Sequence, residues 1–181
     1  MRIHVTGASA SGTSTLGAAL ASALKGRHFE ADDYYWLPTS PPFTEKRAAP
    51  ERLSLLTNHL NAAETPVLAG SIVGWGPQLE DSFDFIVFLY LDAAVRVERL
   101  RQREIARYGY ANPEFLEWAA QYDDGPSEGR SLAKHRAWLE ARTCPIIEIP
   151  GDLSVSERMA AIVRAAPDLS FDKVLPYGRD D

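Results

Sequence analysis

The sequence predicts a three-layer α/β/α fold in which helices cover both faces of a mostly parallel five-stranded sheet. Short β-rich runs alternate five times with segments whose apolar residues recur at helical spacing. One of these runs, residues 83–91, is almost continuously apolar, as expected for a strand buried on both faces of a parallel sheet. The chain has 181 residues, so residues 1–181 are expected to form a single domain.

The first third of the chain predicts two strands and two helices. Residues 2–6 are β-rich and end at a glycine, which predicts the first strand, and residues 15–25 have the apolar spacing of a helix. Residues 28–31 are expected to form a second short strand. Several prolines in residues 37–50 predict a loop that lies over a surface, and a helix is expected over residues 51–63.

The remainder of the chain continues the alternation. Asp92 stands where the N-cap of a helix is expected, and that helix should run to about Tyr108. Glycines and prolines then surround a short helical piece within about residues 108–128, and the tail from about 167 to 181 is expected to pack loosely. The other expected elements are strands at 66–69, 83–91 and 145–149 and helices at 131–142 and 155–165.

The loop after the first strand carries the most specific motif. Residues 7–15 read GASASGTST, which matches the phosphate-binding pattern G-x-x-x-x-G-K-[ST] at Gly7, Gly12 and Ser14. In such a loop, backbone N–H groups and the start of the following helix bind phosphate, and Ser14 would help to hold Mg²⁺. The motif follows a strand and opens a helix, so the sequence predicts a P-loop NTPase fold. The residues expected to bind the nucleotide are Gly7, Ala8, Ser9, Ala10, Ser11, Gly12, Thr13, Ser14 and Thr15.

Thr13 stands where the pattern requires lysine. That lysine normally neutralises charge on the β- and γ-phosphates, and a threonine donates only a neutral hydrogen bond. Either another cation replaces the lysine, or the protein binds nucleotide without turning it over quickly.

With this loop, the chain resembles the nucleoside and nucleoside-monophosphate kinase branch of P-loop proteins, which includes adenylate, cytidylate, uridine and shikimate kinases. The resemblance covers about residues 1–165. It rests on GASASGTST and FLYLDAAVRVERLRQRE at 88–104, with weaker support from ADDYYW at 31–36 and PVLAGS at 66–71. It implies ATP and Mg²⁺ as cofactors and a lid near residues 108–128.

The resemblance also implies roles for an acidic pair and for two arginines. In such kinases, a carboxylate at Asp32 or Asp33 would accept the proton of the attacking hydroxyl or hold the acceptor. Arg99 and Arg103 would stabilise the transferring phosphoryl group and supply the charge that Thr13 lacks. They share one helix face with Arg96 and Arg107, which a solvated charged face would also explain. Turn capping is likewise an alternative role for one aspartate.

Bulk composition excludes several classes of protein. The net charge of -6 argues against general nucleic-acid binding, which depends on neutralising phosphates with Lys and Arg. Cys144 is the only cysteine, which rules out an internal disulfide or a cysteine-based zinc cluster and fits a reducing cytoplasm. No apolar run is long enough for a membrane span. The four histidines lack metal-ligand spacing.

Three functions follow from these observations. The first is an ATP-dependent phosphotransferase acting on a nucleoside, nucleoside monophosphate or similar small hydroxyl acceptor. The second is a non-catalytic nucleotide-binding sensor or regulatory protein with a degenerate P-loop. The third, sulfuryl transfer, needs a histidine or lysine base that the sequence does not place. The sequence leaves the acceptor and the oligomeric state open.

Overall fold

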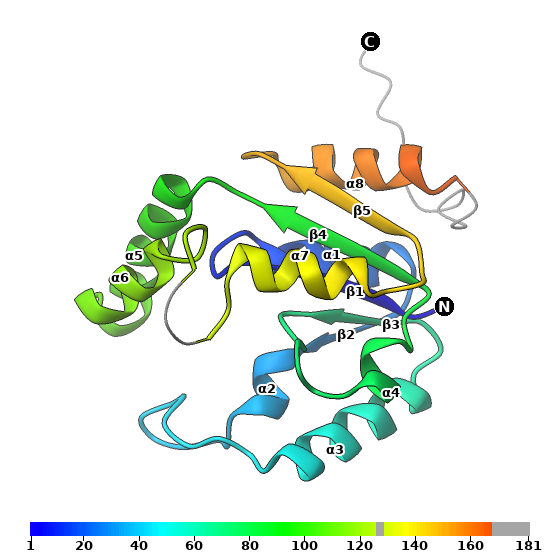
Figure 1. Ribbon diagram of the computed structural model, residues 1–181, viewed down its shortest axis with the longest axis horizontal. Coiled ribbons are helices and arrows are strands. Elements are labelled where there is room, and N and C mark those ends of the chain that lie inside the picture. The colour runs from blue at the N-terminus through cyan, green and yellow to red at the C-terminus, as the bar shows by residue number, and fades with distance from the viewer. Residues whose placement is uncertain (126–128, 168–181) are drawn as a thin grey trace.

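The computed structural model describes residues 1–125 and 129–167 (Figure 1). Its strands are β1 (Ile3–Gly7), β2 (Arg27–Glu30), β3 (Pro66–Ala69), β4 (Phe85–Tyr90) and β5 (Ile146–Pro150). Its helices are α1 (Thr13–Ala23), α2 (Ala31–Tyr35), α3 (Ala49–Ala62), α4 (Pro77–Glu80), α5 (Ala93–Tyr108), α6 (Pro113–Ala120), α7 (Leu132–Glu140) and α8 (Val155–Ala165).

The five strands form one sheet in the order β2-β3-β1-β4-β5, and every neighbouring pair is parallel. β1 lies in the middle, where Val5 pairs with Ala69 of β3 and with Val87 of β4. Because all strands run the same way, their carboxyl ends meet at one edge, which is where ligands bind in open α/β sheets. The predicted five-stranded parallel sheet is confirmed.

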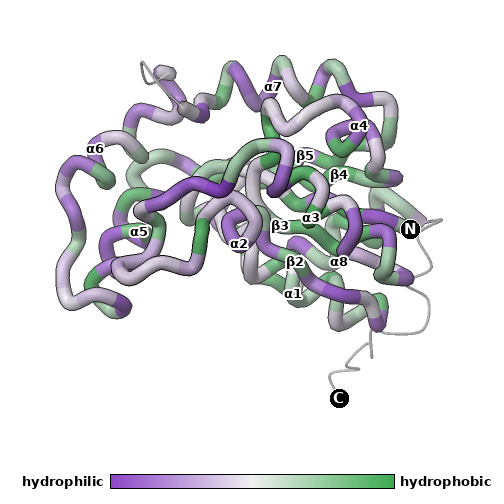
Figure 2. Tube along the Cα trace, turned by 90° about the horizontal axis from the view of Figure 1, so that it is seen from below, coloured by the Kyte–Doolittle hydropathy of each residue, from purple (hydrophilic) through white to green (hydrophobic). Residues whose placement is uncertain are grey.

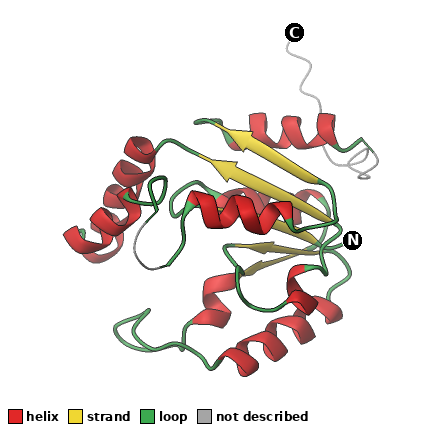
Figure 3. Cartoon of the chain, viewed as in Figure 1, coloured by secondary structure: helices red, strands yellow, loops and turns green. Residues whose placement is uncertain are grey.

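Helices cover both faces of the sheet (Figure 3). Along β4, Phe85, Val87 and Leu89 point into the core beneath α1 and α8, and Ile86 and Phe88 point into the core beneath α3, α4 and α7. This alternation is the two-sided burial that the apolar run predicted. Hydrophobic residues are accordingly concentrated along the strands at the centre of the molecule (Figure 2). The three-layer α/β/α prediction is confirmed.

α5 and α6 project beyond one end of the sheet (Figure 1). They pack on each other through a small core of their own, centred on Leu100, Leu116 and Ala119. Ile105, Tyr108 and the following Tyr110 are exposed at the far end of this hairpin. The hairpin occupies much of the predicted lid segment, of which residues 126–128 lie outside the described residues.

Most predicted elements form, with two differences that concern the site. The first helix begins at Thr13, two residues before the apolar periodicity of residues 15–25, so Ser14 and Thr15 belong to its first turn. The second strand ends at Glu30, and the acidic pair falls in the short helix α2 rather than in an extended segment. α4 was not predicted.

The loosely packed tail was predicted for about 167–181, of which residues 168–181 lie outside the described residues. The described part of the chain contains no helix with the length and hydropathy of a membrane span.

Candidate functional site

The P-loop bends sharply between β1 and α1. Ala10 and Gly12 have φ angles of 64° and 97°, in the left-handed region, and the Ser11 amide donates to the Ala8 carbonyl at 3.1 Å. Left-handed residues within a tight loop turn successive N–H groups toward a common concave side, which is the arrangement that binds anions. Ser11 is fully buried, and its hydroxyl has no partner among the described residues.

The start of α1 completes this anion-binding geometry. Gly12 is the N-cap residue, and no side chain caps the helix. The amides of the first turn, from Thr13 to Thr15, therefore have neither intrahelical carbonyls nor a capping side chain to satisfy them. A phosphate would accept from these donors at the positive end of the helix dipole. The loop and the helix start fit a nucleotide polyphosphate.

Ser14 meets a carboxylate that the sequence analysis did not select. The exposed Ser14 hydroxyl donates to Oε2 of Glu30 at 3.1 Å, and Nε2 of His28 lies 3.2 Å from Glu30 Oε1. Partial burial raises the pKa of Glu30, the hydrogen bond from Ser14 opposes that rise, and Asp32 and Asp33 add to it. Glu30 is the last residue of β2, so its place at the carboxyl edge was the available signal.

Asp32 and Asp33 occupy the first turn of α2 and are exposed. Their charges act on Glu30, so the structure brings the predicted acidic pair to the neighbourhood of Ser14. A hard cation such as Mg²⁺ prefers oxygen ligands of this kind and usually keeps several waters. Within the described ranges, however, no group of three or more His, Cys, Asp or Glu side chains could hold a metal by itself. Mg²⁺ at this position would depend on Ser14 and on phosphate oxygens.

Four of the five arginines of α5 share one helix face but differ in depth, namely Arg96, Arg99, Arg103 and Arg107. Arg99 is partly exposed and forms an ion pair with Asp152, the second residue after β5. Arg103 is exposed and contacts the neighbouring Glu104 at 3.4 Å. Arg107 lies near the end of the helix beside the Tyr108 ring. The predicted site residue Arg99 is thus at the carboxyl edge of the sheet, whereas Arg103 lies one helical turn farther along the projecting helix.

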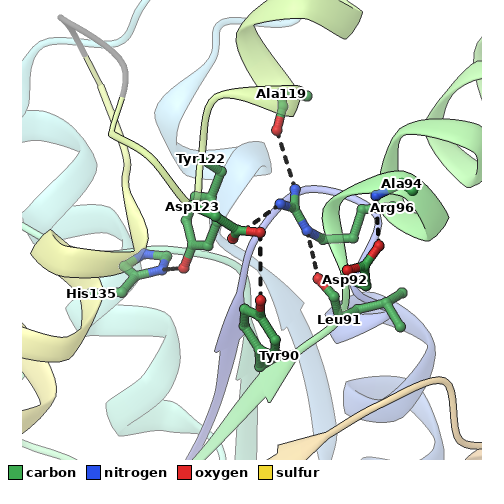
Figure 4. Close-up of polar contacts among 9 residues, drawn as sticks. All are labelled: Tyr90, Leu91, Asp92, Ala94, Arg96, Ala119, Tyr122, Asp123 and His135. Atoms are coloured by element: carbon green, nitrogen blue, oxygen red, sulfur yellow. Dashed lines mark hydrogen bonds and ion pairs between the residues drawn. The ribbon is translucent and has the colours of Figure 1, made fainter.

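Arg96 is buried and anchors the hairpin to the sheet (Figure 4). Its guanidinium donates to the carbonyl of Leu91 at 2.8 Å, to the carbonyl of Ala119 at 3.2 Å and to the Asp123 carboxylate at 3.2 Å. Asp123 also accepts from the hydroxyl of Tyr90 at 3.5 Å. These bonds join the end of β4, the start of α5 and the segment after α6, so Arg96 holds the hairpin against the sheet.

The carboxyl end of β3 is joined to the same anchor by a buried histidine. The Oγ of Ser71 lies 3.1 Å from Nε2 of His135, whose Nδ1 lies 2.6 Å from the hydroxyl of Tyr122. The guanidinium of Arg96 lies 5.0 Å from the centre of the Tyr122 ring. No carboxylate ends β3, and Asp92, at the end of β4, caps α5 by accepting from the amide of Ala94 at 2.9 Å. The expected N-cap is confirmed.

A narrow pocket separates the P-loop from the hairpin. Ala8 and Ser9 line its P-loop side, and Arg130, Trp118 and Tyr122 line the other. The guanidinium of Arg130 lies 5.9 Å from the centre of the Trp118 ring. The sequence analysis did not select Arg130, although it stands just before the helix N-cap Ser131, where the Gly/Pro-containing segment ends.

Aromatic and cationic side chains gather on the other side of the carboxyl edge. The rings of Tyr35 and Trp75 are stacked, with centroids 6.1 Å apart and planes 28° apart. The Arg52 guanidinium lies 4.7 Å from the first ring and 4.8 Å from the second. Lys46 lies within about 6 Å of the rings of Tyr35 and Trp36, a cation–π distance. We call these five side chains the aromatic cluster: Tyr35, Trp36, Trp75, Arg52 and Lys46. Two of them, Tyr35 and Trp36, come shortly after Asp32 and Asp33 in the chain.

The chain is 43% identical over 171 residues to a Bacillus subtilis (strain 168) protein named Uncharacterized protein YqaC, covering 89% of this chain and 94% of that protein. The chain belongs to the YqaC family. No protein-family model matches it.

Solved structures show that this YqaC family member has the fold of P-loop small-molecule kinases. Shikimate kinase from Bacteroides thetaiotaomicron aligns with a TM-score of 0.60 and 16% identity, over 92% of this chain and 98% of that chain. Deoxyadenosine kinase from M. mycoides with bound dATP aligns with a TM-score of 0.60 and 14% identity, over 92% of this chain and 100% of that chain. A gluconokinase from Sinorhizobium meliloti 1021 aligns with a TM-score of 0.55 and 21% identity, over 95% of this chain and 97% of that chain. The predicted family fold is confirmed, and these low identities establish the fold alone.

Proposed function

We propose that this protein is a single-domain, cytoplasmic, ATP-dependent phosphotransferase acting on a nucleoside, a nucleoside monophosphate or a similar small hydroxyl compound. The observation that supports this proposal most is the start of α1, which has no side-chain cap and follows a loop with left-handed residues at Ala10 and Gly12. In the first turn of this helix, Ser14 contacts Glu30. Phosphate binding needs the first feature, and a metal-assisted transfer needs oxygen ligands near it.

In this proposal, the backbone amides from Ala8 to Thr15 bind the nucleotide phosphates. Ser14, which contacts Glu30, would help to hold Mg²⁺, and that ion would supply positive charge to the phosphate oxygens. Arg99 and Arg103 stabilise the phosphoryl group as it moves. Arg99 would first have to exchange its ion pair with Asp152 for the phosphate.

A carboxylate at the end of β2 would accept the acceptor's proton. The acceptor oxygen forms a bond to the terminal phosphorus, the bond from that phosphorus to the oxygen of the leaving ADP breaks, and the hydroxyl proton passes to the carboxylate. Asp32 and Asp33 were predicted for this role, and Glu30 joins them because burial raises its pKa toward the value that suits a general base.

The aromatic cluster supports an acceptor with a planar base. Stacking on rings such as Tyr35 and Trp36 suits a nucleobase better than a sugar acid, because every base has a π-face. Among the fold relatives, one is a deoxyadenosine kinase, whereas others act on shikimate or are named gluconokinase. We therefore place nucleosides and nucleoside monophosphates first among the acceptors.

The test is acceptor-dependent release of ADP from ATP with Mg²⁺. Purified protein is incubated with a panel of nucleosides, nucleoside monophosphates, shikimate and gluconate, and ADP is measured against an acceptor-free control. A nucleoside or nucleotide should raise ADP production well above that control, and Ser14→Ala should reduce the increase. If no compound raises ADP production, the protein is not a phosphotransferase for this class of acceptor.

Thr13 supports a second candidate, a nucleotide-binding sensor that does not turn its ligand over. The side chain at this position carries no charge, and the charge of a P-loop lysine contributes to transfer more than to simple occupancy. This candidate predicts saturable ATP binding with no acceptor-dependent ADP. Binding calorimetry beside the ADP assay separates the two functions.

A further inference from the structure

Arg158 lies against the P-loop, 147 positions along the chain from the residue that it contacts. Its Nη1 donates to the carbonyl of Ser11 at 2.9 Å, and only 4% of the residue is exposed. It belongs to the first turn of α8, the helix that follows β5 and packs beside α1 on the same face of the sheet. A buried cation therefore lies against the phosphate-binding loop.

This cation has no matched anion among the described residues. Its Nε is buried without a hydrogen-bond partner, and no carboxylate of residues 1–125 or 129–167 lies within ion-pair distance of it. The negative charge of Asp152 favours the protonated form of Arg158, but Asp152 already forms an ion pair with Arg99. Burial and the charge of Arg99 both lower the pKa of Arg158, and Asp152 only partly opposes them. A buried arginine remains charged, so an anion bound nearby would relieve an unfavourable positive potential.

Gly12 shows how tightly the loop fits this side chain. A Cβ atom added at Gly12 would lie 2.5 Å from Nη1 of Arg158, and the φ angle of 97° already disfavours any residue with a side chain. The guanidinium thus fills the space beside the second glycine of the motif, directly before Thr13. Arg99, Arg103 and Arg130 are partly or fully exposed, whereas Arg158 is buried against the loop itself.

We propose that Arg158 supplies the positive charge that Thr13 lacks. It acts through the loop as a positioning residue: it fixes the Ser11 carbonyl and places a cation behind the amides that bind the polyphosphate. This inference rests on the proposed binding of a nucleoside triphosphate, and it does not require that the phosphate be transferred. Charge fixed in a buried position stabilises an anion more than the same charge on a mobile side chain in water.

The test compares nucleotides that differ in phosphate number. Calorimetry with Mg²⁺ gives Kd for ATP, ADP, AMP and adenosine with the wild type and with Arg158→Met. ATP binding should weaken about tenfold or more, as expected when a charged hydrogen-bonding group is lost, and the loss should shrink stepwise toward adenosine. The matched control is Arg164→Met, which removes the same charge from the exposed last turn of α8, about 9 Å along the helix. It should leave all four affinities unchanged.

Thr13→Lys provides a second measurement. If Arg158 replaces the missing lysine, Thr13→Lys should restore ATP affinity to Arg158→Met by a larger factor than it adds to the wild type. Equal factors in the two backgrounds would overturn the inference, as would a uniform loss for all four ligands. If Arg158→Met does not fold, Arg158→Lys and Arg158→Gln decide. The lysine variant should keep ATP affinity within about threefold and the glutamine variant should not, because only lysine retains the charge.

The two proposals fail separately. If ATP binding depends on Arg158 but no acceptor raises ADP production, the proposed phosphotransferase activity is refuted and the inference about Arg158 is supported. Acceptor-dependent turnover with unchanged ATP affinity in Arg158→Met would support the enzyme and overturn this inference. A wild type that binds no ATP would overturn both.

Discussion

Acidification should destabilise this protein through two buried histidines. His4 is fully buried between the rings of Phe83 and Trp138, and its Nε2 donates to the Gly70 carbonyl at 2.7 Å. His135 is equally buried. Burial is the main cause that lowers the pKa of His4 from 6.5 to about 4 and the pKa of His135 from 6.5 to about 3.

The sign of the effect follows from proton uptake. Between the folded and unfolded pKa values, the unfolded chain binds more protons, so the free energy of unfolding rises with pH and falls on acidification. The stability that depends on the neutral histidines is nearly complete at pH 7 and is lost as the pH falls through 6.5, toward about 4 for His4 and about 3 for His135. At pH 5, each histidine should cost about 2 kcal/mol relative to pH 7. The sum of about 4 kcal/mol is a large part of the roughly 5–15 kcal/mol that typically stabilises a domain.

The assay is urea denaturation at pH 7, 6 and 5, with tryptophan fluorescence as the signal that monitors unfolding. His4→Gln keeps an amide near the position of Nε2 but does not titrate. The loss of stability between pH 7 and pH 5 should therefore be about 2 kcal/mol smaller in this variant than in the wild type. The carboxylates titrate alike in both proteins and cancel in the comparison. Parallel wild-type and variant curves would show that His4 does not drive the acid sensitivity.

Three further predictions concern single contacts. Arg96→Met should lower the free energy of unfolding by about 3 kcal/mol, because it removes the side-chain donor to two buried carbonyls and the ion-pair partner of Asp123, and chemical denaturation measures the loss. Gly12→Ala should destabilise the protein by about 1–3 kcal/mol through the positive φ and the contact with Arg158, and should weaken ATP binding in calorimetry. Asp92→Ala should cost about 1 kcal/mol in thermal unfolding, because α5 loses its N-cap, whereas Asp92→Asn should retain most of that stability.

The regular elements were predictable because their signals are local. The strand at 66–69 and the helix at 155–165 have the predicted bounds, since each is set by its own periodicity and by flanking residues. The capping box of Ser154 and Glu157 is a local signal of this kind. The phosphate-binding loop was also predictable, because its motif lies within nine consecutive residues.

The electrostatic details of the site were not predictable, because they depend on distant contacts. Nothing near Arg158 in the sequence indicates that it meets Ser11, since only the packing of α8 beside α1 brings them together. The arginines three or four residues apart on α5 share one helix face, but the helix runs outward from the sheet, so Arg96 is buried and Arg103 is exposed. Glu30 was missed because a one-residue shift in the end of β2 decides which carboxylate faces Ser14.

The position of β1 has a consequence for synthesis of the chain. β1 is made before either of its partners in the sheet, which are β3 at residues 66–69 and β4 at residues 85–90. At about 5–20 residues per second, the ribosome needs roughly 4–17 s after completing β1 to complete β4. Ile3 and Val5, fully buried in the folded protein, have no sheet to join during that interval. The pairing of β1 with both neighbours, and with it the phosphate-binding loop, should therefore form only once β4 has left the ribosome.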